Sequence, residues 1–306
     1  MNLSISNSNH WLRLFFLTLS GLLITFIILS ELLLRFIVDR YDLWEKHREV
    51  FFLKKAANVV MGDSHSANGF TGVGGFINLS YPSESVEIIE LKAGEYFKNH
   101  APQKVILQAD PHMFSDYRKF REQKNIVPYY QRPGKTPLRL LSPQYKENIV
   151  AYWKAAFKLH LKSRFYFEED GAQTSENIWP DKESGSKALE SEIEERLRVL
   201  IPMKDYETSN PMNSFRNILA YFKSQNADVC LVTFPMSPLF IKRAEDFPEF
   251  RKIQAYFKNL AVQYGFKYVN QWDQVTDPNL FSNEDHLNRK GALIFSRQTN
   301  EKCFGN

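Results

Sequence analysis

Asn58 to Ser66 reads NVVMGDSHS, an apolar run that stops at Gly62-Asp63-Ser64. Residues 58–61 predict a short buried strand. Ser64 would then stand at the carboxyl end of a strand, where open α/β sheets bind their ligands. If a helix begins there, its backbone N–H groups and positive dipole end can stabilise an oxyanion beside the Ser64 hydroxyl. The alternative is a structural turn in which Asp63 or Ser64 caps the helix.

Four more apolar segments predict strands. They are residues 76–79 (FINL), 105–109 (VILQA), 229–234 (VCLVTF) and 267–270 (KYVN). Helical patterns occupy residues 83–98, 211–225, 250–264 and 288–298. This alternation indicates an α/β fold with one parallel sheet of five strands, right-handed crossovers and helices on both faces.

Pro111 to Asp228 separates the third and fourth predicted strands and contains no convincing strand of its own. A structureless loop of that length is uncommon in a compact domain. Residues 143–163 and 186–200 have helical periodicity, and the polar stretches GAQTSEN and DKESGS lie between them. We therefore expect a helical insertion with polar linkers over about 115–205, placed over or beside the sheet.

A second polar block, Ser282-Asn283-Glu284-Asp285-His286, precedes the last predicted helix. A loop histidine beside acidic and amide groups is well suited to act as a general base. The alternative is an ordinary helix flank with solvated charges.

Together the two blocks resemble the SGNH (GDSL-type) hydrolase superfamily, whose first block is Gly-Asp-Ser and whose last is Asp-x-x-His. More narrowly, GDSH (62–65), DHLNRKGA (285–292) and one apolar N-terminal segment look like the membrane-anchored SGNH-like proteins of bacteria. Their relatives include alginate acetylation proteins and the D-alanyl transfer protein of teichoic acids. The resemblance implies a flavodoxin-like three-layer α/β/α sandwich, and it does not extend to the insertion.

The resemblance also implies a serine esterase or O-acyltransferase that transfers or removes an acyl group, most simply acetyl, on a glycan outside the cytoplasm. Ser64 would be the nucleophile and His286 the base, with Asn283 and Asp285 as candidates for orienting the ring. The backbone N–H groups of Ser64 and Ser83 would donate to the oxyanion. A membrane-bound acyltransferase would be the partner, and no cofactor or metal is expected.

Two oxyanion positions depart from the superfamily pattern. Ser83 stands where a glycine is expected, and the block Gln108-Ala109-Asp110-Pro111-His112 lacks the expected asparagine. The Ser83 backbone N–H can still donate, because it does not depend on the side chain. Gln108 or His112 could replace the missing amide, and Asp63 and His65 are further candidates for supporting roles.

Asn283 occupies the position from which an aspartate normally orients the base. The corresponding exchange in a serine protease triad costs about 10⁴ in turnover. Asp285 is an alternative carboxylate, although a residue adjacent to His286 in sequence rarely points back at its ring. Either another carboxylate serves, or His286 works in a weaker dyad, or the chain is an inactive scaffold that binds glycan or a membrane partner. If His286 is the base, Asn283→Asp should raise turnover.

Leu14 to Leu34 carries one charge, Glu31. A helix over this range is about 30 Å long, the thickness of the hydrocarbon layer. The apolar run continues past Arg35, so we expect a retained anchor and not a cleaved signal peptide. The expected organisation is a tail and transmembrane helix over 1–38, a juxtamembrane segment over 39–57 and an SGNH-like domain over 58–306.

Basic residues flank the apolar segment unequally, with Arg13 before it and Arg35, Arg40, Lys46 and Arg48 after it. Counted literally, this keeps the main domain in the cytoplasm. The resemblance implies the opposite, and long domains translocate largely regardless of charge. We therefore expect a single-pass protein of the bacterial inner membrane with its main domain outside the cytoplasm.

Overall charge and cysteine content narrow the choice of class further. Lys and Arg number 39 against 35 Asp and Glu, a net charge of +4 that argues against a nucleic-acid binder. Cys230 and Cys303 have no zinc spacing and cannot build a disulfide framework, so they predict nothing about the redox compartment. Four histidines are too scattered to predict a metal site, namely His10, His47, His100 and His160.

Overall fold

The computed structural model describes residues 6–38, 43–119, 130, 165–179 and 187–305. The chain divides into two compact units, Met1–Asp42 with Gly134–Ser163 and Leu43–Pro133 with Arg164–Asn306. In the first unit, α1 (Ser6–Leu33) continues into a π-helical turn at Leu34–Val38. The span His10–Phe36 is long and apolar enough to cross a membrane, with a mean hydropathy of 2.3. The helix predicted at 143–163 lies outside the described residues.

A parallel sheet of five strands, in the order β2-β1-β3-β6-β7, forms the centre of the second unit. The strands are β1 (Asn58–Met61), β2 (Ile77–Asn78), β3 (Lys104–Gln108), β6 (Asp228–Thr233) and β7 (Lys267–Asn270). All five predicted strands are confirmed. The order is that of flavodoxin-like folds, in which the chain leaves β1 for opposite sides of the sheet. This switch point lies at the carboxyl ends of β1 and β3, directly before Ser64 and Asp110.

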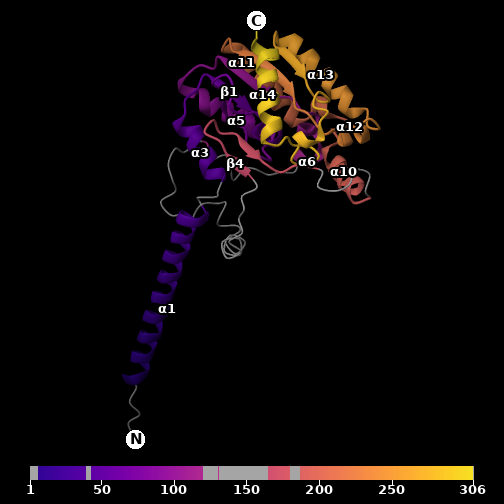
Figure 1. Ribbon diagram of the computed structural model, residues 1–306. Helices are drawn as coiled ribbons and strands as arrows, with labels where there is room; N and C mark the ends of the chain where they lie inside the picture. The colour runs from indigo at the N-terminus through magenta and orange to yellow at the C-terminus, as the bar shows by residue number, and fades with distance from the viewer. Residues whose placement is uncertain (1–5, 39–42, 120–129, 131–164, 180–186, 306) are drawn as a thin grey trace. The chain divides into compact units, whose positions relative to one another are not determined.

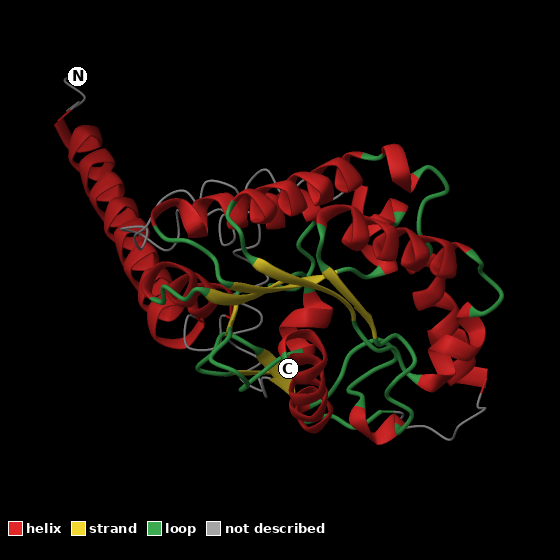
Figure 2. Ribbon diagram, turned by 90° about the horizontal axis from the view of Figure 1, so that it is seen from above, coloured by secondary structure: helices red, strands yellow, loops and turns green. Residues whose placement is uncertain are grey.

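Helices surround the strands on both sides, as Figure 2 shows. In chain order they are α3 (Leu43–Leu53), α4 (Ser64–Gly69), α5 (Val86–Tyr96), α6 (Asp116–Lys119), α10 (Lys187–Leu200), α11 (Asn210–Ser224), α12 (Pro238–Ala244), α13 (Glu249–Tyr264) and α14 (Arg289–Phe304) (Figure 1). Short 3₁₀ turns occupy Phe97–Asn99, Pro111–Phe114, Tyr206–Thr208 and Pro278–Leu280.

Alternate residues of the strands enter two separate apolar cores. Val59 and Val105 pack with the buried faces of α5, α11 and α13. Val60 and Ile106 pack with α14 and the aromatic residues around it. Because successive side chains of a strand point to opposite faces, a strand buried on both faces must be apolar at successive positions, as β1 is at Val59, Val60 and Met61. The predicted three-layer α/β/α sandwich is confirmed.

The sequence predicted a purely helical insertion, but the insertion also contains two strands. β4 (Phe165–Phe167) and β5 (Gln173–Ser175) form an antiparallel hairpin. The stretch GAQTSEN is therefore not a polar linker, since residues 172–175 within it are buried. A buried strand of small polar residues lacks the apolar alternation by which strands are recognised, so it escapes a sequence reading. The helix predicted at 186–200 is confirmed as α10.

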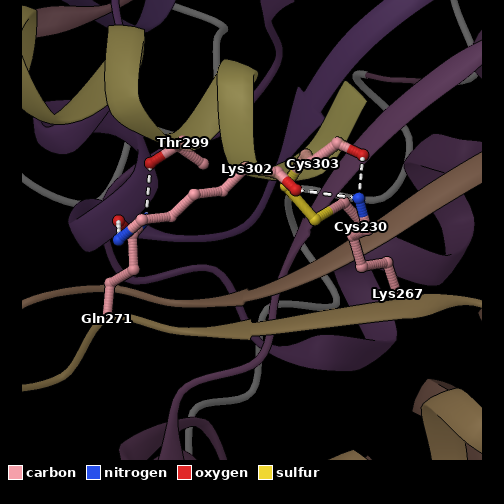
Figure 3. The surroundings of a disulfide bond; sticks show 6 residues. All are labelled: Cys230, Lys267, Gln271, Thr299, Lys302 and Cys303. Carbon is pink, nitrogen blue, oxygen red and sulfur yellow. Dashed lines mark hydrogen bonds between the residues drawn. A yellow bond between two sulfur atoms is a disulfide. The ribbon is translucent and has the colours of Figure 1, made fainter. Parts of the chain in front are cut away.

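A disulfide joins Cys230 in β6 to Cys303 near the end of α14, with Cα atoms 5.7 Å apart (Figure 3). Lys267 Nζ donates to the backbone carbonyls of Lys302 at 2.9 Å and Cys303 at 3.1 Å, which fixes the end of α14 beside β7. The two cysteines are 73 residues apart, so no local spacing pattern predicts their bond. The expectation that the cysteines carry no information about redox environment is therefore corrected.

Candidate functional site

Ser64 is the first residue of α4, directly after the turn that leaves β1. The turn needs glycine at position 62, because a Cβ there would lie 2.3 Å from Gln108 Oε1. Asp63 caps the helix, since its carboxylate accepts from His65 N at 3.0 Å. The N-cap alternative is thus correct for Asp63, and it coexists with a partly exposed Ser64 at the helix start.

His286 lies in a tight loop before α14. The loop closes through a bridge between Phe281 and Leu287 and a hydrogen bond from Ser282 N to His286 O at 2.8 Å. Within it, Asn283 Oδ1 accepts from the backbone N–H groups of Asp285 at 3.1 Å and His286 at 2.7 Å. The Asn283 side chain therefore shapes the loop that carries the histidine.

The imidazole of His286 is held at one nitrogen and unpaired at the other. Nδ1 lies 3.0 Å from Asn283 Oδ1, its hydrogen-bond acceptor, and 2.6 Å from Asp285 Oδ1. Nε2 is buried and has no hydrogen-bond partner among the described residues. A proton on Nδ1 leaves the Nε2 lone pair available, which is the tautomer a general base requires. Asp285 does point back at the ring, contrary to the expectation from its position in sequence.

Burial lowers the pKa of His286, and the positive charges of His65 and Arg196 lower it further, while Asp285 opposes the shift. The ring is therefore neutral at pH 7. Burial raises the pKa of Asp285, but His286 and Arg196 outweigh it and hold that pKa well below the ordinary value. Asp285 Oδ2 binds Arg196 at 2.6 Å from Nε and 2.5 Å from Nη2. A carboxylate fixed in this way supplies the negative charge that Asn283 lacks.

A buried polar cluster lies beside these residues and consists of Asp63, His65, Gln108, Asp110 and His112, none more than 2% exposed. His65 Nδ1 lies 2.9 Å from Asp110 Oδ2, and His65 Nε2 lies 3.5 Å from Asp285 Oδ2. Burial lowers the pKa of His65, but Asp110 and Asp285 outweigh it and raise the pKa to about 10. His65 is thus an imidazolium that links the cluster to Asp285.

Gln108 and His112 do not supply the missing oxyanion amide. Both nitrogen-bound protons of the Gln108 amide are used, on Asp63 and Asp110 at 2.8 Å each. His112 Nε2 contacts Asp63 Oδ2 at 2.8 Å, and the same oxygen binds Arg118. Neither residue lines the pocket described below. Their roles are to position the turn around Asp63, so these two expectations are corrected.

Two histidine and aspartate groups are compact enough to hold a metal ion. They are His65, Asp110 and His112, and His65, Asp285 and His286, with ligand atoms within 4.8 Å of one another. Both groups depend on His65. The pKa of His65 is about 10, so a metal ion would have to displace the proton of His65 in order to bind at either group.

Ser83 has a backbone φ of 69°, in the left-handed region that favours glycine. This conformation is a physical reason for the glycine expected there. The segment is anchored by the next residue, Glu84, whose carboxylate binds Lys92 Nζ at 2.6 Å and accepts from Tyr130 at 2.5 Å. Ser83 is therefore held in the conformation of its expected counterpart by buried neighbours.

Ser64, Ser83, Asn283 and His286 line one pocket of about 390 Å³. Neither the Ser64 hydroxyl nor His286 Nε2 forms a hydrogen bond within the described part of the chain, so the two groups share the pocket without being bonded to each other. Catalytic hydrogen bonds are often long before a substrate binds. The remaining lining residues are Asn68, Tyr81, Pro82, Tyr117, Arg118, Gln173, Arg196 and Ser282.

Several of these lining residues were missed by sequence reasoning, among them Arg118, Gln173 and Arg196. These three lie in the insertion, at positions 118, 173 and 196, where no sequence pattern connects them to the two ends of the domain. Only the amphipathic pattern of residues 186–200 could have suggested that Arg196 lies near the sheet.

The second unit is an α/β protein with a parallel sheet, a serine directly after the turn that leaves β1 and a histidine directly before α14. Residues 174–302 match the model of the DltD protein family. The matched range includes the His286 loop and most of α14, and it does not include Ser64, which lies before its start. The predicted resemblance to the D-alanyl transfer protein is therefore confirmed for this part of the chain.

Two solved structures are similar to the chain at low identity. A proposed platelet activating factor from Streptococcus pneumonia has 10% identity and a TM-score of 0.43, over 94% of this chain and 99% of that one. A proposed acylhydrolase from Bacteroides fragilis has 11% identity and a TM-score of 0.42, over 85% of this chain and 97% of that one. A search of curated protein sequences finds no match.

Proposed function

We propose that this protein transfers or hydrolyses an acyl group through a covalent acyl-serine formed on Ser64. One observation carries the proposal: His286 is oriented at Nδ1 by Asn283 and Asp285, while its unpaired Nε2 and the Ser64 hydroxyl share a pocket. This is the arrangement that activates a serine hydroxyl by an adjacent base. The match of residues 174–302 to the DltD protein family supports an acyl-transfer chemistry.

In the first half-reaction, Ser64 Oγ attacks the acyl carbonyl carbon, and its proton moves to His286 Nε2. The carbonyl oxygen becomes an oxyanion, which the backbone N–H groups of Ser64 and Ser83 would stabilise. When the tetrahedral intermediate collapses, the bond to the leaving group breaks and the leaving group takes the proton from His286. The product is an acyl ester of Ser64.

In the second half-reaction, a hydroxyl group attacks the acyl-serine carbonyl while His286 accepts the hydroxyl proton. Collapse of the intermediate returns that proton to Ser64 Oγ and releases the acylated hydroxyl. A sugar hydroxyl as acceptor gives O-acyl transfer, and water gives hydrolysis. Asp285 stabilises the imidazolium in both steps, with a charge that is kept in place by Arg196.

The substrate we propose is an extracytoplasmic glycan, and the acyl group is acetyl or D-alanyl. Tyr81 and Tyr117 line the pocket, and aromatic rings that carry a polar hydroxyl suit a sugar. The span His10–Phe36 would hold the site beside the membrane. A membrane-bound acyltransferase is the partner that such a location favours as the source of the acyl group.

The disulfide supports a location of the domain outside the cytoplasm. Disulfides persist in oxidising compartments and are rare in the cytosol, where thiols are kept reduced. Cys230 and Cys303 are both bonded, which leaves the chain without a free cysteine. This argument opposes the cytoplasmic location that the basic residues after the apolar segment indicate. Protease added to spheroplasts should digest the domain while cytoplasmic markers survive, and protection until lysis would contradict both the topology and the glycan substrate.

The catalytic proposal is tested with the full-length protein in detergent and a simple aryl acetate. Wild type should hydrolyse the ester and react with a serine-directed phosphonate, and Ser64→Ala should do neither. A matched control is Ser282→Ala, because Ser282 lines the same pocket but contacts only backbone carbonyls of its own loop. If wild type is inert and Ser64 resists the phosphonate, the chain is a binding scaffold and the proposal is wrong.

A further inference from the structure

Gln173 in β5 has a buried side chain whose amide group makes no hydrogen bond to any described residue. The residue is 1% exposed and lines the pocket that contains Ser64 and His286. Its amide nitrogen, Nε2, is buried without a hydrogen-bond partner in the described ranges. A buried amide left unpaired is destabilising, so such groups in native proteins call for an explanation. In a pocket, that explanation is a ligand atom that completes the hydrogen bond.

The hairpin holds Gln173 in a fixed place. Asn78 N donates to Asp170 O at 2.7 Å, and the Asp170 carboxylate accepts from Thr71 Oγ1 at 3.2 Å and from Gly72 N. Gly171 has a φ of 95°, and a Cβ there would lie 2.3 Å from Asn78 O. The backbone of the hairpin turn is therefore packed directly against the backbone at the end of β2. A donor carried on such a support needs little reorganisation when charge develops in front of it.

The same strand is tied to the helix of the nucleophile. Ser64 and Asn68 are four residues apart on α4, so they lie on one face of that helix. Asn68 Nδ2 donates to the backbone carbonyl of Gln173 at 2.7 Å, and Asn68 also lines the pocket. This bond uses the Gln173 main chain and leaves the side-chain amide unengaged. Gln173 consequently borders the same face of α4 as Ser64.

We infer that the side-chain amide of Gln173 donates a hydrogen bond to the oxyanion formed on the acyl carbonyl, together with the backbone N–H of Ser64. The inference rests on the proposed function. A neutral amide is suited to this role because it stabilises a negative charge without forming a stable ion pair with a carboxylate in the ground state. Rotation about the terminal torsion of the side chain is broad, which lets the NH₂ group reach the carbonyl oxygen.

The test measures kcat, KM and thermal unfolding of Gln173→Leu in the full-length protein with an aryl acetate. Loss of one oxyanion donor lowers kcat by about 10²–10³ and leaves KM unchanged, because the bond forms only in the transition state. The unfolding temperature should stay the same or rise, since an unpaired buried amide is replaced by an apolar group.

Gln254→Leu is the matched control. Gln254 in α13 is also buried, at 4% exposure, and its Nε2 is also without a partner, but it does not line the pocket. Its kcat should equal that of wild type. If Gln173→Leu retains wild-type kcat while Ser64→Ala is inactive, the proposed function stands and the role of Gln173 is refuted. If Ser64→Ala equals wild type, the proposed function fails and the oxyanion role fails with it.

Discussion

Two buried glutamines show how differently the polar interior is built in two regions of this molecule. Gln108 is 0% exposed, and its Oε1 accepts from Asp63 N, Ser66 N and Ser66 Oγ while its Nε2 donates to Asp63 and Asp110. Gln173 is 1% exposed, and its side-chain amide makes no hydrogen bond to any described residue. The saturated amide belongs to the buried polar cluster, and the empty one lines the pocket.

This difference distinguishes polar groups that support the fold from polar groups that can bind a substrate. A polar group whose bonds are all made to protein has nothing left for a substrate, and its removal leaves its partners unpaired. A buried polar group without partners lowers the stability of the fold, and where it lines a pocket its hydrogen bonds are available to a ligand. His286 Nε2 is of the second kind. Changes in the cluster should therefore cost stability, and changes at the unpaired atoms should cost activity.

The largest expected effect is that of Asp285→Asn, which crosses this division because Asp285 is both bonded and part of the site. The variant keeps the shape of the side chain and removes the charge that stabilises the imidazolium, so kcat should fall by about 10⁴. Asn283→Asp should change kcat by less than about tenfold, about 1.4 kcal/mol, because Asp285 already supplies the charge. Steady-state kinetics of both variants show whether Asp285 or Asn283 is the residue on which turnover depends. A near-normal Asp285→Asn would leave Asn283 as the orienting residue.

Gln108→Leu should show the opposite pattern from Gln173→Leu. It removes hydrogen bonds to Asp63, Ser66 and Asp110 and leaves the buried backbone N–H groups of Asp63 and Ser66 without an acceptor, so we expect a loss of about 3 kcal/mol in the free energy of unfolding. Chemical denaturation measures this loss. Gln271→Leu is the control, because Gln271 is equally buried but bonds only Thr299 and Lys302, away from the pocket, and should lose less. A Gln108→Leu variant as stable as wild type would erase the distinction between the two regions.

The smallest expected effect, taken per pH unit, concerns His65, which joins the cluster to the site. Its pKa is about 10 in the folded protein, against about 6.5 when unfolded, so the folded state binds the extra proton between these values. This stabilisation is complete below pH 6.5 and disappears as the pH rises through 10. Stability should therefore fall with rising pH, by up to about 1.4 kcal/mol per pH unit.

His65→Gln isolates this effect from those of other titrating groups. Urea unfolding of wild type and variant between pH 6.5 and 10 should converge as the pH rises, since the wild type loses what the variant never had. Parallel curves would mean that His65 is not protonated in the folded protein. In that case its two neighbouring carboxylates, Asp110 and Asp285, would be held by other groups.

Most of the sheet could be predicted from sequence because its inner strands are buried on both faces. Val59–Met61 is an uninterrupted apolar run, and the observed bounds of β1, Asn58–Met61, equal the predicted ones. The hairpin could not be predicted, because the buried side chains of Gln173–Ser175 are all polar. Polar residues at the surface and polar residues bonded in the interior have the same sequence signature. Only the spatial neighbours of β5 on α4 and β2 distinguish them.

In the site, Ser64 and His286 follow from their places at the ends of predicted elements. The contact of Asp285 with the neighbouring ring does not, because adjacent residues point apart in strands and helices. Here Asn283 Oδ1 accepts from two successive backbone N–H groups, which tightens the loop and brings the Asp285 carboxylate and the His286 ring together. A side chain that acts on the backbone thus decides which carboxylate serves the base.

The bond between Cys230 and Cys303 also determines how the protein can be studied by labelling. The chain has two cysteines and both are in this bond, so the oxidised protein is silent to thiol reagents. A single cysteine introduced at Val262, which is 75% exposed on α13, would then be the one reactive thiol. A fluorophore or spin label could be attached there in intact cells without first replacing native residues. The accessibility of that label to an impermeant reagent would report the side of the membrane on which α13 lies.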